Sequence, residues 1–526
     1  MKLAWLNEWR AGRIRNRELL ILLLLITALA FFYGLGGAPL FDLDEGAFSE
    51  ATRQMFVRGD FISPYVNNQP RFDKPILIYW LQAPSVWLFG VSEFAFRFPS
   101  ALAAALWVAV VYRFVAQQMD RTTALVAGII TATSLGVLAI GRAATADAVL
   151  NLLIAATMLD IFRYYQQRRS IVLYRAFLWM GLGVLTKGPV AVLIPFAVSL
   201  MFFVWRREFG VWLRAVFNPL GLAIMLAVAL PWYGIQYGRE GDAFIQGFFF
   251  KHNLERFSSP MEHHGGGLFY YALVIPLMVL PYTTLLLATL GRFRGALRDE
   301  RLLFLWLWFL FVFIFFSFSG TKLPHYVLYG LTPMFILMAV YREGVRGRAV
   351  LLLPALLFFL PLFFAPEIVA WLQPRVKDSY VAALLSAPGE AFGLGYRLLL
   401  GAALAFVLLL LLEGRIPAWF KLLLAGCVSA VVFVAALTPA AGILQQAPVK
   451  QAALVARQLD EPVVMWRLNT PSFNVYSRKS TEHRDPKPGE VVLTKTRHLA
   501  ELPAYRLLYE QCGVALARVL PAGTKQ

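Results

Sequence analysis

The chain has 526 residues, of which 59% are hydrophobic and only 15% are charged. Soluble globular proteins average about 45–50% apolar and about 25% charged residues, so this composition predicts a polytopic membrane protein and excludes the disordered and collagen-like classes. Two cysteines are too few for a disulfide framework, and we attribute the net charge of +18 to basic cytoplasmic loops rather than to nucleic-acid binding.

Apolar runs recur along the chain at lengths close to the roughly 20 residues that cross a bilayer as a helix. Thirteen such runs lie near residues 18–37, 97–116, 122–140, 146–164, 172–186, 188–205, 213–232, 268–290, 302–319, 326–341, 348–365, 396–413 and 419–438. The sequence therefore predicts an α-helical membrane protein with about 13 transmembrane helices.

Basic residues occupy the N-terminal segment and every second loop after it, for example Arg206 with Arg207 and Arg292 with Arg294. One register fits all of these loops, so we expect them and the N-terminus to be cytoplasmic. The alternate loops, including a long first one at about 38–96, then face the periplasm of a bacterium. The chain is expected to be a multi-pass protein of the inner membrane.

The last part of the chain is more polar than the rest. A helical stretch and short strand-like runs separated by Pro and Gly turns lie at Ala452–Leu459, Val463–Trp466, Val491–Thr494 and Tyr505–Tyr509. We therefore expect two domains: a transmembrane catalytic domain at 1–440, with juxtamembrane helices within 38–96, and a small periplasmic α/β domain at 441–526.

The first outward loop begins with the carboxylates Asp42, Asp44 and Glu45. Carboxylates so close to hydrocarbon are costly unless they face a wet or paired cavity, although acidic residues at a helix start explain them equally well. The residues that follow, 47–58, predict a short amphipathic helix at the membrane interface, and this helix carries Arg53.

Cations are spread over four outward loops at the same expected depth. Arg71 and Lys74 precede an aromatic-rich helix, Lys187 stands between two apolar runs, Arg256 lies in the long loop at about 233–267, and Lys322 lies in a turn. Each either reaches toward lipid phosphates or holds the phosphate of a substrate. Asp147 starts a helix, where it serves either as a cap or as a site residue.

Histidines are concentrated in the long outward loop at about 233–267. His252, His263 and His264 lie within thirteen residues, and with Asp73 or Glu262 they form a hypothetical Zn²⁺ site. No HExxH-like spacing fixes a geometry, and ordinary surface histidines explain the same pattern. Carboxylates and cations from distant loops are nevertheless expected at one membrane face, and we expect them to form one pocket suited to transfer on a phosphate-bearing lipid.

Short motifs in this order resemble those of the lipid-linked-sugar glycosyltransferases of the C-type membrane fold, in the branch of protein O-mannosyltransferases and aminoarabinose (lipid A) transferases. The motifs are Asp44-Glu45 with Glu50 and Arg53, Phe72-Asp73-Lys74-Pro75, Glu93 to Ser100, Asp147, Thr186-Lys187-Gly188-Pro189, His252-Asn253 with Arg256-Phe257, and Lys322-Leu323-Pro324-His325-Tyr326. Two positions depart from the pattern: Gly46-Ala47 stands where Thr-Arg is usual, and Asp73 where Glu is common.

The resemblance implies an inverting transfer of a sugar, such as 4-amino-4-deoxy-L-arabinose, from a polyprenyl-phosphate carrier to lipid A or another envelope glycan. It requires no nucleotide, no nucleic acid and no obligatory cofactor, and Zn²⁺ stays an open alternative. Asp44, Glu45 and Asp147 are the expected catalytic residues. The expected substrate-binding residues are Arg53, Arg71, Lys74, Lys187, His252, Arg256, Lys322, His325 and Tyr326.

Other functions also fit a helical membrane protein. A protein O-mannosyltransferase differs only in donor and acceptor, whereas a lipid flippase or transporter requires ionisable groups near the bilayer midplane. The centres of the expected spans carry almost no charge, which favours chemistry at one surface. A scaffold that displays the tail domain leaves the polar motifs unexplained.

Overall fold

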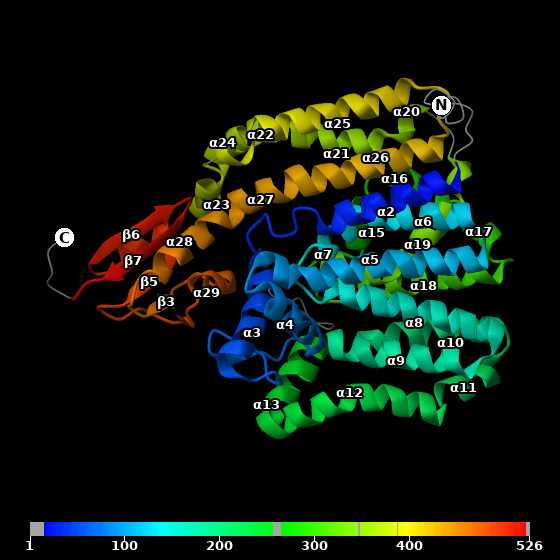
Figure 1. The fold of residues 1–526 in the computed structure, drawn as a ribbon, viewed down its shortest axis with the longest axis horizontal. Helices are drawn as coiled ribbons and strands as arrows, with labels where there is room; N and C mark the ends of the chain where they lie inside the picture. Colours follow the sequence, from blue (N-terminus) through cyan, green and yellow to red (C-terminus); the bar gives the residue numbers. More distant parts are fainter. Residues whose placement is uncertain (1–14, 256–264, 346–347, 387, 522–526) are drawn as a thin grey trace.

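The computed structural model describes residues 15–255, 265–345, 348–386 and 388–521. Most of them form helices that run side by side, and a small β-sheet lies beyond one end of these helices, close to the C-terminus (Figure 1). The expected α-helical class with a C-terminal α/β part is confirmed by this arrangement.

Among the described residues, seven helices are long and apolar enough to cross a membrane, or up to nine if each of two bent pairs is one span. The seven are α5 (Glu93–Gln118), α8 (Asp147–Gln167), α9 (Ser170–Lys187), α12 (Pro219–Glu240), α18 (Glu300–Ser317), α25 (Leu394–Leu412) and the continuous run of α26 (Ala418–Val432), η5 (Phe433–Leu437) and α27 (Thr438–Gln445). The bent pairs are α6 (Arg121–Thr133) with α7 (Leu135–Gly141), and α21 (Leu353–Phe363) with α22 (Ala365–Leu372) and η4 (Gln373–Arg375).

Shorter helices account for the other predicted runs. They are α2 (Asn16–Phe32), α10 (Val190–Trp205), α15 (Tyr270–Met278), α16 (Thr283–Leu290), η2 (Pro324–Gly330), α19 (Leu331–Val340) and α20 (Arg348–Leu351). Each predicted run thus coincides with a helix or a broken helix, while the number of thirteen membrane spans stays a prediction.

The break between α6 and α7 shows why hydropathy alone misses such interruptions. Ser134 at the break has extended backbone angles, and the next amide, that of Leu135, donates to the carbonyl of Leu280, 3.2 Å away. A backbone group released from a helix needs a partner when it is buried. Here that partner comes from a distant part of the chain, which no local pattern reveals.

Two helices of the first outward loop lie at the same end as the sheet (Figure 1). They are α3 (Asp44–Arg58) and α4 (Leu77–Phe89), with the short strands β1 (Tyr65–Val66) and β2 (Gln69–Pro70) between them. α3 begins with two acidic residues, which favour a helix N-terminus, and ends at Gly59 with φ +66°, a conformation that favours glycine. Helices are therefore present where the sequence predicts them, while their position at a membrane interface stays a prediction.

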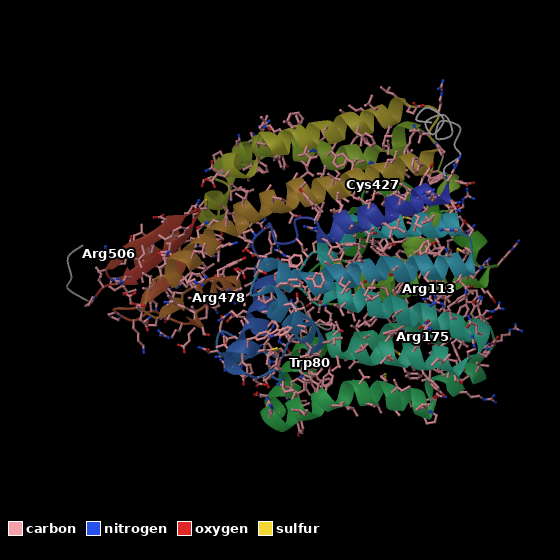
Figure 2. All side chains as sticks on the ribbon, in the orientation of Figure 1. Trp80, Arg113, Arg175, Cys427, Arg478 and Arg506 are labelled. Atoms are coloured by element: carbon pink, nitrogen blue, oxygen red, sulfur yellow. The ribbon has the colours of Figure 1, made fainter. Side chains whose placement is uncertain are left out.

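The remaining short helices lie at the two ends of the bundle. At the end of the sheet they are α13 (Asp242–Ile245), η1 (Gln246–Glu255), α23 (Ser379–Leu384) and α24 (Pro388–Ala391), and away from it α11 (Phe209–Val216), α17 (Phe293–Ala296) and η3 (Arg342–Gly344). Figure 2 shows Arg113 and Arg175 toward the end away from the sheet, and Arg478 and Arg506 at the sheet. Basic side chains therefore occur at both ends.

The C-terminal part contains a five-stranded sheet in the order β4-β3-β5-β7-β6. Its elements are α28 (Ala447–Arg457), β3 (Val463–Met465), α29 (Pro471–Ser477), β4 (Glu482–His483), β5 (Val491–Lys495), η6 (Thr496–Glu501), β6 (Tyr505–Gln511) and β7 (Val514–Val519). β3 runs parallel to β4 and β5, and β7 is antiparallel to β5 and β6. The three predicted strands are present, and β4 and β7 were not predicted.

The predicted domain boundary at residue 440 falls inside a helical region, where only Gln446 separates α27 from α28. The division of the chain there stays a prediction. Cys427 in α26 and Cys512 in the turn before β7 are both free, in agreement with the expectation that the chain has no disulfide framework.

Candidate active site

A cavity of about 440 Å³ lies where α3, α5 and α8 begin. We call it the acidic cavity, because its lining includes the carboxylates Asp42, Asp44, Glu45 and Asp147. Three cationic or basic side chains share its wall: Arg97, Arg142 and His325. Residues from the first loop, from the start of α8 and from η2 are thus brought to one place.

A second cavity, of about 480 Å³, has a different chemistry, and we call it the aromatic cavity. Apolar side chains form most of its wall, among them Phe249, Phe250, Phe315 and Phe316. The polar lining includes Asp73, Lys74, Lys187, His252 and Tyr326. An apolar chamber with lysines in its wall suits an apolar chain that carries an anionic group.

One cluster of side chains stands between the two cavities. Nζ of Lys187, at the end of α9, lies 2.5 Å from Oδ1 of Asp147, at the start of α8. The Tyr329 hydroxyl donates to Oδ1 of Asp147 over 3.1 Å and accepts from Nζ of Lys187 over 2.9 Å. Nε2 of His325 lies 3.4 Å from Nζ of Lys187. Asp147 and His325 line the acidic cavity, and Lys187 and Tyr329 line the aromatic one.

Local sequence explains how Lys187 comes to this position. α9 ends at Lys187, and Gly188 follows with φ +79°, a value that a side chain disfavours. Pro189 then immediately precedes α10, where its missing amide hydrogen costs nothing. The chain reverses within two residues and leaves the lysine at the helix end, as the sequence predicts.

The expected single pocket is divided into two adjoining cavities. Asp44 lines the acidic cavity and Lys74 the aromatic cavity. The Asp147–Lys187 ion pair, with the Tyr329 hydroxyl, joins the walls of the two cavities. Sequence alone identifies polar residues at one depth but does not show which of them pair with one another.

Asp44 differs from the other carboxylates of the acidic cavity. Within the part of the chain that the structure describes, its carboxylate makes no hydrogen bond or ion pair. Asp42 accepts hydrogen bonds from the amide and hydroxyl of Ser472, and Asp147 is bound to Lys187 and Tyr329. Asp44 is therefore the carboxylate whose lone pairs are available to a substrate.

Glu45 is bound on both oxygens. It forms a two-pronged ion pair with Arg97, at 2.7 and 2.8 Å, and it also accepts from the amides of Phe41 and Ala144. Glu45 and Arg97 are both about 4% exposed or less. This carboxylate holds the start of α3 against α5, so we assign it a positioning role, although the sequence places it among catalytic residues.

Arg71, Asp73 and Lys74 form a compact group beside the aromatic cavity. Nε of Arg71 lies 2.5 Å from Oδ1 of Asp73, and Nζ of Lys74 lies 3.4 Å from Oδ2. Burial raises the pKa of Asp73, but the charges of Arg71 and Lys74 more than offset it and hold that pKa well below its usual range. The carboxylate is therefore ionised, and the group has a net charge of +1.

The other expected binding residues have mixed positions. His252 and Tyr326 line the aromatic cavity. Lys322 is buried and donates to the carbonyl of Ser319 over 2.7 Å. Arg53 is paired with Glu50 at 2.7 Å and lines neither cavity, so the structure does not bring it to the site.

Three expected residues, Arg256, His263 and His264, lie outside the described residues. Within the described ranges, no group of three or more His, Cys, Asp or Glu side chains is arranged to hold a metal ion. The hypothetical zinc set of Asp73, His252, His263 and His264 stays a prediction, because half of it falls in the undescribed segment.

The C-terminal part contacts the first loop at the wall of the acidic cavity. Ser472, at the start of α29, binds Asp42, and the Tyr476 hydroxyl accepts from the amide of Leu40 over 2.7 Å. Burial raises the pKa of Asp42 to about 7, although the hydrogen bonds from Ser472 oppose this shift. α29 thereby fixes the loop that carries Asp44.

Sequence reasoning did not single out Arg97, Arg142, Tyr329 or Ser472. A charged residue inside an apolar run, as Arg97 is, is itself a pointer to function or pairing. Tyr329 follows Tyr326 by three residues, the spacing that places both on one helix face. Nothing in the sequence indicates that Ser472, more than 400 residues away, reaches Asp42.

The sequence is similar to one protein family and to several curated proteins. Residues 73–235 match the model of the dolichyl-phosphate-mannose-protein mannosyltransferase family. An undecaprenyl phosphate-alpha-4-amino-4-deoxy-L-arabinose arabinosyl transferase from Yersinia enterocolitica is 31% identical over 333 residues, which are 62% of this chain and 60% of that protein. The protein of the same name from Yersinia pestis is 30% identical over 338 residues, with the same shares. The chain thus spans about 60% of the length of these curated relatives.

Comparison with solved structures supports the fold. The crystal structure of ArnT from Cupriavidus metallidurans bound to undecaprenyl phosphate matches with a TM-score of 0.80 and 19% identity, over 96% of this chain and 99% of that chain. In its motifs, its sequence and its fold, the chain resembles the polyprenyl-phosphate-sugar glycosyltransferases of the aminoarabinose-transferase and protein-mannosyltransferase family.

Proposed function

We propose that the chain transfers a sugar, 4-amino-4-deoxy-L-arabinose or a related one, from a polyprenyl-phosphate carrier to lipid A or another envelope acceptor on the periplasmic face. The observation that carries this proposal is the pair of cavities with different chemistry, separated by a single ion pair between Asp147 and Lys187. The names of the Yersinia relatives support the same donor class.

The aromatic cavity is the proposed donor site. Its phenylalanine lining suits the apolar polyprenyl chain, and Lys74 and Lys187 suit the phosphate. When the sugar–phosphate bond breaks, negative charge builds up on the departing phosphate. Fixed cations stabilise that charge without having to reorganise, and losing one such donor typically lowers kcat by about 10²–10³-fold.

The acidic cavity is the proposed acceptor site. Asp44 has the free lone pairs that a general base requires, and a general base contributes about 10²–10⁴-fold. Arg142 lines the same cavity, and its buried Nε has no hydrogen-bond partner among the described residues. A guanidinium and a carboxylate in the wall of one cavity suit an acceptor that presents both a hydroxyl and a phosphate.

The proposed reaction is a single displacement at the anomeric carbon. An acceptor oxygen forms the new bond on one face while the bond to the carrier's phosphate oxygen breaks on the other, so the configuration inverts. The bonding electrons leave with the phosphate, and the acceptor proton passes to Asp44. The donor sugar must therefore reach past the Asp147–Lys187 pair, and we infer that sugar binding separates this pair.

Purified protein in detergent, supplied with polyprenyl-phosphate-linked sugar and lipid A, tests the function directly. Mass spectrometry is expected to detect sugar-modified lipid A, which a transporter cannot produce. Asp44→Asn and Lys74→Met are each expected to lower the rate by about 10²–10³-fold or more.

Matched controls are Asp460→Asn and Lys377→Met, which make the same chemical changes at exposed positions away from both cavities. These two variants are expected to keep wild-type rates. The proposed function is contradicted if no modified lipid forms, or if Asp44→Asn and Lys74→Met work as well as the controls at equal protein levels.

A further inference from the structure

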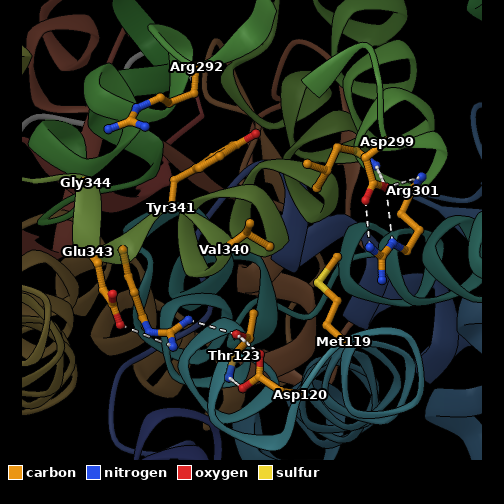
Figure 3. Close-up of a pocket in the computed structure, with 12 residues that line it drawn as sticks. Met119, Asp120, Thr123, Arg292, Asp299, Arg301, Val340, Tyr341, Glu343 and Gly344 are labelled. Carbon is orange, nitrogen blue, oxygen red and sulfur yellow. Dashed lines mark hydrogen bonds and ion pairs between the residues drawn. The ribbon is translucent and has the colours of Figure 1, made fainter. Parts of the chain in front are cut away.

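A third cavity, of about 610 Å³, lies at the end of the bundle away from the candidate active site. It is surrounded by the end of α5, the starts of α6 and α18, the segment before α17, and the end of α19 with η3 (Figure 3). Its volume falls in the range of about 300–1,000 Å³ that is usual for ligand sites. None of its lining residues takes part in the proposed reaction.

Three arginines line this cavity: Arg292 and Arg301, from the connection between α16 and α18 and the start of α18, and Arg342, from η3. Arg301 is fully engaged by Asp299, at 2.6 Å, and by the carbonyl of Gln118, at 2.8 Å. Arg342 donates through Nη1 to Thr123 and to a backbone carbonyl, but its buried Nε has no hydrogen-bond partner within the described residues.

Arg292 is the cation available to a ligand. Across the described ranges, its guanidinium makes no hydrogen bond and no ion pair. It lies close over the backbone of η3, where a methyl group on Gly344 would come within 3.2 Å of Nη2 of Arg292. Figure 3 shows Arg292 and Tyr341 on one side of the cavity and the Asp299–Arg301 pair across from them.

The carboxylates of this cavity do not neutralise Arg292. Asp120 caps α6 through Thr123, and Asp299 caps α18 and pairs with Arg301. Glu343 is 77% exposed and lies 3.8 Å from Arg342.

We propose that this cavity binds a phosphate group, held by the guanidinium of Arg292, with Arg342 as a further cation in the wall. Arginine matches the geometry of phosphate oxygens, and basic pockets between membrane helices commonly bind lipid headgroups. The phosphate is carried either by a phospholipid of the adjacent leaflet or by a soluble ion. The site is separate from the proposed donor and acceptor cavities, so the test of this proposal does not depend on the proposed function.

Isothermal titration calorimetry on the full-length, delipidated protein in an uncharged detergent tests the site. The two probes are inorganic phosphate and dihexanoyl-phosphatidylglycerol. At least one probe is expected to bind, and Arg292→Gln is expected to weaken it by about 10- to 100-fold, the usual weight of a charge-assisted contact. Binding of the lipid alone identifies the leaflet as the source, and binding of phosphate alone identifies the solution.

The matched control is Arg294→Gln, which removes the same charge two residues away from a side chain that does not line the cavity. It is expected to change the affinity less than twofold. Equal weakening by Arg292→Gln and Arg294→Gln would show only a general effect of charge and would overturn the proposal. Failure of both probes to bind the wild type would overturn it as well.

Discussion

Glu45 and Arg97 join the first turn of α3 to the first turns of α5 through a buried ion pair. Arg97 also donates to the carbonyls of Leu35 and Ala38, at 3.0 and 2.7 Å. This one guanidinium therefore holds both the chain that leads into the first loop and the helix that carries Asp44. Its role is structural, because a buried arginine without its carboxylate partner strongly destabilises the fold.

Replacing Glu45 by Gln is therefore expected to destabilise the fold by about 3–5 kcal/mol, the usual cost of breaking a buried pair. Thermal unfolding in detergent measures the effect. Glu367→Gln is the matched control, because its pair with Arg397 at 2.7 Å is exposed, and it is expected to change the midpoint little. Equal midpoints for the two variants would contradict the role assigned to Glu45.

Asp42 gives the protein a specific dependence on pH. Because burial raises its pKa from 3.8 to about 7, the folded chain keeps a proton that the unfolded chain has lost between these values. The stability that this group contributes is therefore complete below about pH 4, falls as the pH rises toward 7, and changes little above that.

The variant Asp42→Asn removes this titration while its amide oxygen still accepts from Ser472. The unfolding midpoint of the wild type is expected to fall more between about pH 5 and pH 7 than that of the variant. Midpoints measured across this range in detergent check the prediction. Parallel curves for the two proteins would contradict the raised pKa.

Charged residues at positions where charge costs much free energy were predictable from the sequence. Asp44, Asp147, Lys74 and Lys187 stand where charge is expensive, and the structure places all four in the walls of the two cavities. Their pairing was not predictable. Whether a lysine contacts Asp147 or Asp44 depends on differences of a few ångströms between helices that are far apart in the sequence.

At the scale of the elements, the approach of α29 to the start of α3 depends on Gly46. A methyl group built on Gly46 would lie 2.0 Å from Oδ1 of Asp42 and 2.6 Å from the amide nitrogen of Ser472. Such distances are too short for any side chain. The threonine that is usual at this position in the family that the chain resembles does not fit here, which explains this departure from the motif.

Gly46→Ala is expected to push α29 away from α3 and to cost about 1–3 kcal/mol, as overpacking does. Hydrogen–deuterium exchange of residues 471–477 is expected to speed up. Gly210→Ala in α11 is the matched control, because a methyl group there meets open space. Equally slow exchange of residues 471–477 in the two variants would contradict the close contact between α29 and the start of α3.

Helices were predicted more reliably than their interruptions. Each of the thirteen apolar runs coincides with helix, because burial in lipid requires long apolar stretches. The break at Ser134 and the strand β7 were not predicted. A break is stabilised by the carbonyl of Leu280 and a strand by its neighbour in the sheet, and neither partner is local.

At the scale of the whole molecule, the sequence predicts that the polar segments lie together at one end of the bundle. The structure places Asp44, Asp147, Lys74 and Lys187 in the walls of two cavities. The division of the site is the main difference from the sequence-based expectation of one pocket. In the proposed function the carrier's phosphate binds in the aromatic cavity and the acceptor in the acidic cavity, with Asp147 and Lys187 at the boundary.

The affinity of the purified protein for undecaprenyl phosphate tests this division most directly. Lys74→Met is expected to raise the dissociation constant by about 10- to 100-fold, because it removes a charge-assisted contact to the phosphate. Asp44→Asn, in the other cavity, is expected to change it less than about twofold. If Asp44→Asn weakens binding as much as Lys74→Met, or if neither variant weakens it, the two-cavity account is contradicted.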